Sequence, residues 1–146
     1  EAGAVSAGAS AARCAQLRRF GQDLGLAFQL VDDALDYSGS SASLGKNPGD
    51  DFREGKATLP LILAMARSGE AERAFWTRTV DLREQSEGDF ERACDLMQRS
   101  GALDTTLALA ADYAASAKAA LSEFAGSNSW RPALEELADF AVVRRM

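Results

Sequence analysis

Residues 11–37 read AARCAQLRRFGQDLGLAFQLVDDALDY and carry the clearest structural pattern of the chain. Large apolar side chains recur in this stretch at steps of three and four residues, namely Leu17, Phe20, Leu24, Phe28, Val31 and Leu35. That spacing is the period of an α-helix. At 1.5 Å per residue such a helix would be roughly 40 Å long. A helix of that length indicates a large helical bundle.

The composition favours the same fold class. The chain has 146 residues, with 29 Ala and 17 Leu against five Val and one Ile. Alanine and leucine are strong helix formers, whereas β-branched residues favour strands. Only three prolines interrupt the chain. The sequence therefore predicts an all-α protein.

Further helices are expected on both sides of the central one. Glycine and proline divide the rest of the chain, and residues 38–58 lack helical periodicity. The expected helices are residues 1–10, 59–67, 70–84, 86–100, 102–124 and 130–145, joined by a loop at 38–58. No repeat or linker is apparent, so residues 1–146 are predicted to form a single helical domain.

Charge and residue usage exclude several functional classes. The chain has 16 Lys and Arg, 22 Asp and Glu, and a net charge of −6, which disfavours nucleic-acid binding. It has no histidine, which argues against zinc sites and histidine-based catalytic triads. Cys14 and Cys94 are far apart and fit buried free thiols in a reducing cytosol, so we expect a cytoplasmic protein. No apolar run is long enough to predict a membrane span.

An acidic cluster ends the central helix. Asp32, Asp33 and Asp36 lie within five positions, and Gln29 is one turn earlier on the same face. Aspartates at i and i+4 repel each other. A divalent cation relieves that repulsion, and carboxylate oxygens suit Mg²⁺. A solvated acidic face is the alternative, and these residues alone leave both interpretations open.

The loop that follows adds positive charge. Lys46 and Lys56 are two of the three lysines in the chain, and glycines flank both. Lysine binds phosphate as a point charge, so the aspartates, Mg²⁺ and these lysines suggest a diphosphate clamp. Ordinary loop solubility is the alternative for the lysines. Asp50 and Asp51 could orient Lys46, bind metal-bound water or cap the next helix.

These motifs together resemble a known family. GQDLGLAFQLVDDALDY at 21–37, followed by LGKNPGDDFREGKATLPLI at 44–62, is similar to the second aspartate-rich region of trans-type polyprenyl diphosphate synthases. SWRPALEELADFAVVRR at 129–145 resembles the C-terminal helix of the long-chain bacterial members, such as octaprenyl and decaprenyl diphosphate synthases. The similarity covers the chain as the C-terminal part of an all-α isoprenoid-synthase bundle.

The resemblance implies a role for each matching residue in a magnesium-dependent prenyltransferase. Asp32, Asp33 and Asp36 match the carboxylates that hold Mg²⁺ on the allylic diphosphate. Lys46 and Lys56 match lysines that contact diphosphate oxygens. The aspartates and Lys46 are thus the predicted catalytic groups.

The remaining predicted residues would bind substrate. Phe28 and Gln29 match a pair that lines the isoprenoid pocket, and Asp50 matches an acidic position associated with the metal–diphosphate site. Family members are usually homodimers. They join isopentenyl diphosphate to an allylic diphosphate, and the long-chain members make precursors of ubiquinone side chains.

One family feature is absent from this sequence. A first DDxxD motif, which faces the second in the family, does not occur. We therefore expect the 146 residues to be a partial enzyme that does not catalyse elongation alone. Dimerisation is expected to cover the apolar faces that such a chain would expose. The alternative is a non-catalytic helical subunit or interaction domain that retains a relic magnesium–diphosphate site.

Overall fold

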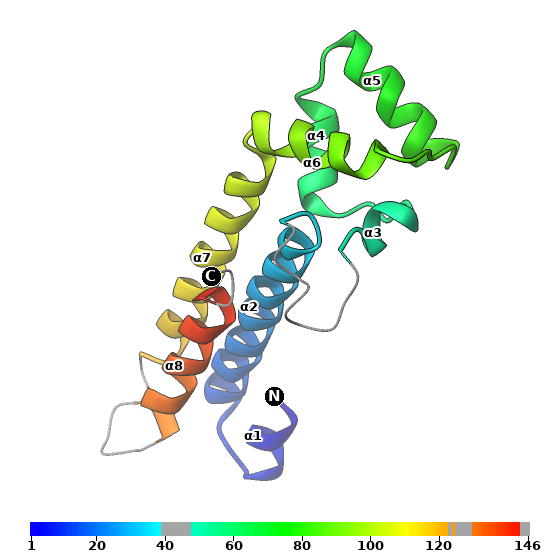
Figure 1. Cartoon of the computed structure of the whole chain (residues 1–146). Coiled ribbons are helices and arrows are strands. Elements are labelled where there is room, and N and C mark those ends of the chain that lie inside the picture. The colour runs from blue at the N-terminus through cyan, green and yellow to red at the C-terminus, as the bar shows by residue number, and fades with distance from the viewer. Residues whose placement is uncertain (39–47, 123, 125–129, 144–146) are drawn as a thin grey trace. The chain divides into compact units, whose positions relative to one another are not determined.

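The computed structural model describes residues 1–38, 48–122, 124 and 130–143, and every regular element among them is helical (Figure 1). Eight α-helices and one π-helical turn follow each other in these ranges. They are α1 (Ala2–Ser6), α2 (Ala11–Leu35), α3 (Asp50–Arg53), α4 (Leu59–Ala66), α5 (Glu70–Trp76), the π-helical η2 (Thr77–Asp81), α6 (Asp89–Arg99), α7 (Ala102–Ala120) and α8 (Trp130–Val143). The predicted all-α fold is confirmed. None of the described helices has both the length and the apolar character that a bilayer crossing requires.

The chain divides into two compact units. Unit 1 comprises residues 1–31 and 108–146, and unit 2 comprises residues 32–107. Helix α2 ends in unit 2, and helix α7 begins there. The single domain expected from the sequence remains a prediction.

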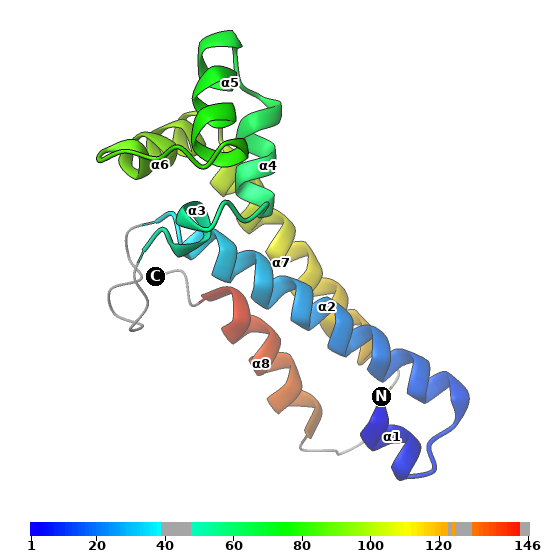
Figure 2. The same cartoon turned by 90° about the vertical axis from the view of Figure 1, so that its right-hand side faces the viewer.

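Unit 1 is built on alanine-rich helix contacts. Helices α2 and α7 run side by side in it (Figure 2). The buried face of α7 presents Ala110, Ala114 and Ala117, small side chains that let another helix approach closely. Phe20 of α2 packs with Ala117 and Leu121. Unit 1 therefore contains few large side chains at its centre.

Polar contacts also join the helices of unit 1. The Ser116 hydroxyl of α7 donates a hydrogen bond to the Asp23 carboxylate of α2 at 2.7 Å. Lys118 of α7 pairs with Asp139 of α8. These contacts give the weakly apolar interface a defined register.

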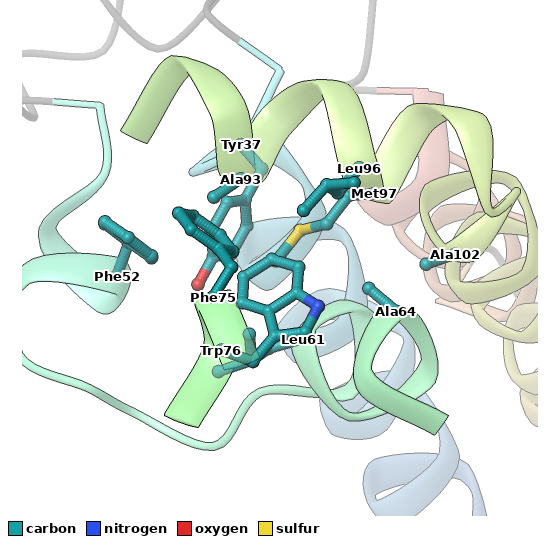
Figure 3. Close-up of a cluster of buried hydrophobic side chains, with 10 residues drawn as sticks. All are labelled: Tyr37, Phe52, Leu61, Ala64, Phe75, Trp76, Ala93, Leu96, Met97 and Ala102. Atoms are coloured by element: carbon teal, nitrogen blue, oxygen red, sulfur yellow. The ribbon is translucent and has the colours of Figure 1, made fainter. Parts of the chain in front are cut away.

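Unit 2 has an aromatic core (Figure 3). Its buried members are Tyr37, Phe52, Leu61, Ala64, Phe75, Trp76, Ala93, Leu96, Met97 and Ala102. The Trp76 ring packs edge-on against Phe75, with 4.9 Å between ring centroids. Its indole N–H donates to the Ser68 hydroxyl at 2.9 Å. Trp76, the largest side chain of the core, is therefore buried with its only polar group hydrogen-bonded.

Helix boundaries differ from the sequence prediction at four places. The first helix ends at Ser6, the helix expected at 70–84 changes to a π-helical turn after Trp76, and α7 ends at Ala120. Helix α6 begins at Asp89 because the Asp89 carboxylate accepts the Ser86 N–H at 2.7 Å and pairs with Arg78, which closes a turn before the helix. Such local hydrogen bonds compete with helix formation.

The predicted loop at 38–58 contains a short helix, α3. Four residues are too few to show a helical period in the sequence. Helix α3 forms because Asp36 and Gln85, from other parts of unit 2, bond to its backbone.

Candidate functional site

The predicted aspartates end α2 within unit 2. Asp33 is buried, and Asp32 and Asp36 are half-buried. Asp32 and Asp33 both make further interactions with their surroundings. Lys46 lies outside the described residues, so its predicted role remains a prediction.

Phe28 and Gln29 belong to unit 1. Both are exposed on α2, and 44% of the Phe28 side chain is open to solvent. An exposed aromatic ring on a helix is consistent with a pocket-lining role, which remains a prediction.

The Asp36 carboxylate ties the end of α2 to the start of α3. Its Oδ1 accepts the Gly49 N–H at 3.1 Å, and its Oδ2 accepts the Asp51 N–H at 3.0 Å. The Asp36 carbonyl oxygen also accepts the Gly49 N–H, at 3.0 Å. Burial raises the pKa of Asp36, and the two N–H donors oppose that rise. Both carboxylate oxygens are therefore used to hold backbone.

Lys56 is oriented by Asp51. The Lys56 ammonium lies 2.9 Å from Asp51 Oδ1, and the Lys56 N–H donates to the Asp51 carbonyl at 2.9 Å. The hydrogen bond to Asp51 raises the pKa of Lys56, and the charges of Asp33 and Asp32 raise it further. The Lys56 side chain is 50% exposed. A cation thus lies in the field of the α2 aspartates and stays open to a ligand.

Asp50 has a different partner. Arg53 lies 2.6 Å from Asp50 Oδ1 and also donates to the Pro48 carbonyl at 2.8 Å. Asp50 is exposed. Of the three roles considered for Asp50 and Asp51, the structure shows Asp51 orienting a lysine, but that lysine is Lys56. Asp36, rather than either of them, holds the N–H groups at the start of α3.

Three further residues hold α3 in place. Phe52 is buried in the aromatic core, and the Gln85 side-chain amide donates to the Phe52 carbonyl at 2.9 Å. Gly49 has a φ of +84°, and a Cβ there would meet the Phe90 ring at 2.6 Å. Only glycine combines a positive φ with so close an approach. Gln85 could not be predicted from the sequence, because no local pattern links it to a residue 33 positions earlier.

Two buried hydroxyls lie next to this site. Tyr37 follows Asp36, and Thr58 precedes α4. Neither hydroxyl makes a hydrogen bond of ordinary geometry among the described residues, although Thr58 is near enough to offset part of the rise that burial causes in the Tyr37 pKa. Figure 3 shows Tyr37 within the aromatic cluster. Tyr37 is therefore a neutral packing residue that the sequence analysis did not single out.

The described residues contain no group of three or more acidic, cysteine or histidine side chains placed to hold a metal ion. Asp32 and Asp33 still offer hard oxygen donors that suit Mg²⁺ and Ca²⁺. The Lys56 ammonium suits an anion that shares the metal. A hollow of about 660 Å³ in unit 2 is less suitable. Its described lining includes Glu91, Asp95 and Asp104 but no lysine or arginine, so it would repel a diphosphate. The aspartate–lysine group suits a diphosphate bound through a divalent cation.

Comparison with known proteins leads to the same family that the sequence motifs resemble. The family model for polyprenyl synthetase matches residues 1–97. The chain therefore belongs to the polyprenyl synthetase family. It is 42% identical over 128 residues to octaprenyl diphosphate synthase of Escherichia coli K12, covering 88% of this chain and 39% of that protein.

Solved structures match nearly the whole chain. A polyprenyl synthase from Caulobacter crescentus CB15, crystallised with calcium and isoprenyl diphosphate, is 65% identical with a TM-score of 0.91 and covers 99% of this chain and 44% of its own. A decaprenyl diphosphate synthase from Rhodobacter capsulatus is 43% identical, also with a TM-score of 0.91 and the same coverage. The chain thus spans about two fifths of the relatives that it matches.

Proposed function

We propose that this chain carries the allylic-diphosphate half of the active site of a long-chain polyprenyl diphosphate synthase. The whole enzyme would condense isopentenyl diphosphate with an allylic diphosphate to make a precursor of quinone side chains. The observation that carries the proposal is the Lys56 ammonium, held 2.9 Å from Asp51 in the field of Asp33 and Asp32. The Caulobacter relative, which binds calcium and isoprenyl diphosphate, supports it.

The roles of the charged residues follow from their chemistry. Asp32 and Asp33 would hold Mg²⁺ through carboxylate oxygens. When bound, the metal supplies positive charge that stabilises the diphosphate as it leaves. The Lys56 ammonium, and Lys46 by its place in the motif, would contact diphosphate oxygens. Asp36 was predicted as a third ligand.

Other parts of the proposal rest on the motif alone. Phe28 and Gln29 would line the isoprenoid pocket, and Asp50 would lie near the metal–diphosphate site. The whole enzyme would be a cytoplasmic homodimer.

A chimaera tests this function. The chain would replace the matching stretch of the Caulobacter synthase, and the product would be measured with isopentenyl diphosphate, an allylic primer and Mg²⁺. We expect elongation, with a loss of at least about 10³-fold on changing both Asp32 and Asp33 to Asn, because charge stabilisation at the leaving group is removed. Glu54→Gln, an exposed carboxylate in the same segment, is the control and should retain activity.

A folded but inactive chimaera would contradict the proposal and favour a non-catalytic subunit with a relic site. The 146-residue chain alone should give no elongation product. Robust product from it would contradict the view that a partner motif is required.

A further inference from the structure

We infer that Asp36 is a positioning residue and not a magnesium ligand: it fixes the start of α3 so that Asp51 presents the Lys56 ammonium to the diphosphate. The inference rests on the proposed function, because it assigns a role within the same site. It separates three aspartates of one motif into two metal-binding side chains and one that holds backbone.

The first step is the use of the Asp36 oxygens. Oδ1 and Oδ2 each accept one backbone N–H, from Gly49 and Asp51, at 3.1 and 3.0 Å. A carboxylate that turned toward a metal would release these N–H groups. The Gly49 N–H would keep the Asp36 carbonyl oxygen as an acceptor, but the Asp51 N–H would lose its Asp36 acceptor, which is costly in a partly buried place.

Contacts from the rest of unit 2 fix the orientation of α3. The Phe52 side chain is buried in the core, and Gln85 donates to the Phe52 carbonyl at 2.9 Å. The Phe90 ring packs directly against Gly49. These contacts hold the body of α3, and Asp36 holds its first N–H groups. Helix α3 is thus clamped at both ends and cannot turn freely.

The third step leads from Asp36 to the ligand. The Asp51 backbone N–H donates to the Asp36 carboxylate, and the Asp51 carboxylate pairs with the Lys56 ammonium at 2.9 Å. The Asp51 side chain is 16% exposed, whereas Lys56 is 50% exposed. The ammonium is therefore the outermost member of the series, and its position depends on Asp51 and, through it, on Asp36.

The first experiment tests, in the 146-residue chain, the hydrogen bonds from the Gly49 and Asp51 N–H groups to the Asp36 carboxylate. Amide hydrogen exchange is followed by NMR in the wild type, Asp36→Ala, Asp36→Asn and the control Asp33→Asn. We expect faster exchange at Asp51 in the Asp36 variants and a smaller increase at Gly49, because the Gly49 N–H keeps the Asp36 carbonyl oxygen. Both changes should be smaller for Asn, since its amide keeps one acceptor oxygen. Unchanged exchange at both positions would overturn the inference, whatever the chain binds.

The second experiment measures inorganic diphosphate binding by calorimetry, with and without Mg²⁺. Asp33→Asn should abolish the Mg²⁺ dependence. Asp36→Asn should keep that dependence while binding weakens roughly ten- to a hundredfold, the effect of losing one charge-assisted contact. Asp51→Asn keeps the backbone N–H that donates to Asp36 and should weaken binding by the same factor. Equal losses in the two variants would show that the loss in Asp36→Asn is not due to misfolding.

A double-mutant cycle separates positioning from metal binding. In the Lys56→Gln background, Asp36→Asn should cause no further loss, because both changes remove the same contact. Full additivity would show that Asp36 does not act through Lys56, and loss of the Mg²⁺ dependence in Asp36→Asn would show that Asp36 is a metal ligand; either result would overturn the inference. If the wild type binds no diphosphate at all, the proposed function fails, and hydrogen exchange alone decides the role of Asp36.

Discussion

The two units of this chain differ in how far they bury their large apolar side chains. Unit 2 buries Trp76 and Phe52 almost completely and holds its short helix with polar side chains. Unit 1 buries alanine side chains along α7 and leaves large apolar side chains exposed. Eight of the ten exposed large apolar residues that the structure describes belong to unit 1, namely Val5, Leu26, Phe28, Leu109, Trp130, Leu137, Phe140 and Val143. Unit 2, which contains the aspartate–lysine group, thus leaves fewer large apolar side chains exposed than unit 1 does.

This difference agrees with a chain that spans about two fifths of its relatives. Large exposed apolar patches mark faces that meet another protein surface, and unit 1 carries most of the exposed large apolar side chains that the structure describes. The residues that position Lys56 do not depend on such a face, because Asp36, Phe52 and Gln85 all lie in unit 2.

The largest expected effect contrasts the two tryptophans. Trp76→Ala should lower the free energy of unfolding by about 3–5 kcal/mol, because it removes a buried ring and leaves a cavity. Trp130→Ala should change it by less than about 0.5 kcal/mol, since Trp130 is 74% exposed. Urea unfolding followed by circular dichroism measures both. Equal losses would show that unit 1 has a core as dependent on its aromatic residues as unit 2.

Alanine substitution of one glycine in each unit should change the free energy of unfolding in opposite directions. Gly49→Ala should destabilise the chain by about 1–2 kcal/mol, because φ is +84° and the new methyl group meets Phe90. Gly25→Ala should stabilise it by about 0.5–1 kcal/mol, because Gly25 lies within α2 and has open space around it. Thermal unfolding of both variants checks the signs. A stable Gly49→Ala variant would mean that α3 is not held as tightly as the contacts indicate.

The smallest expected effect concerns pH. The hydrogen bond from Arg78 lowers the pKa of Asp89 below its ordinary value. The pair therefore contributes stability above about pH 4, the range in which an unfolded aspartate is ionised, and loses it as the pH falls through the lowered value. Asp89→Asn should flatten the dependence of the urea midpoint on pH between about 5 and 2. Arg78→Gln, which removes the partner of Asp89, should flatten the slope in the same way. A slope as steep as in the wild type for both variants would contradict the prediction.

The length of α2 and the helical fold could be predicted because apolar spacing is a local property that one helix satisfies by itself. The family could also be predicted, since its motif lies within 21–62. The start of α6 and the existence of α3 could not. Asp89 delays α6 by bonding to Ser86 and Arg78, and α3 is stabilised by Asp36 and Gln85 from elsewhere in the chain.

The sequence by itself determined the helical class, the family and the residue types available for binding Mg²⁺ and diphosphate, because each depends on short-range spacing. Only the tertiary structure distinguished among like residues. It paired Asp51 with Lys56 and Asp50 with Arg53, and it turned Asp36 toward the backbone of α3. Identical carboxylates acquire different roles because partners and burial, which depend on distant parts of the chain, decide which hydrogen bonds each one makes.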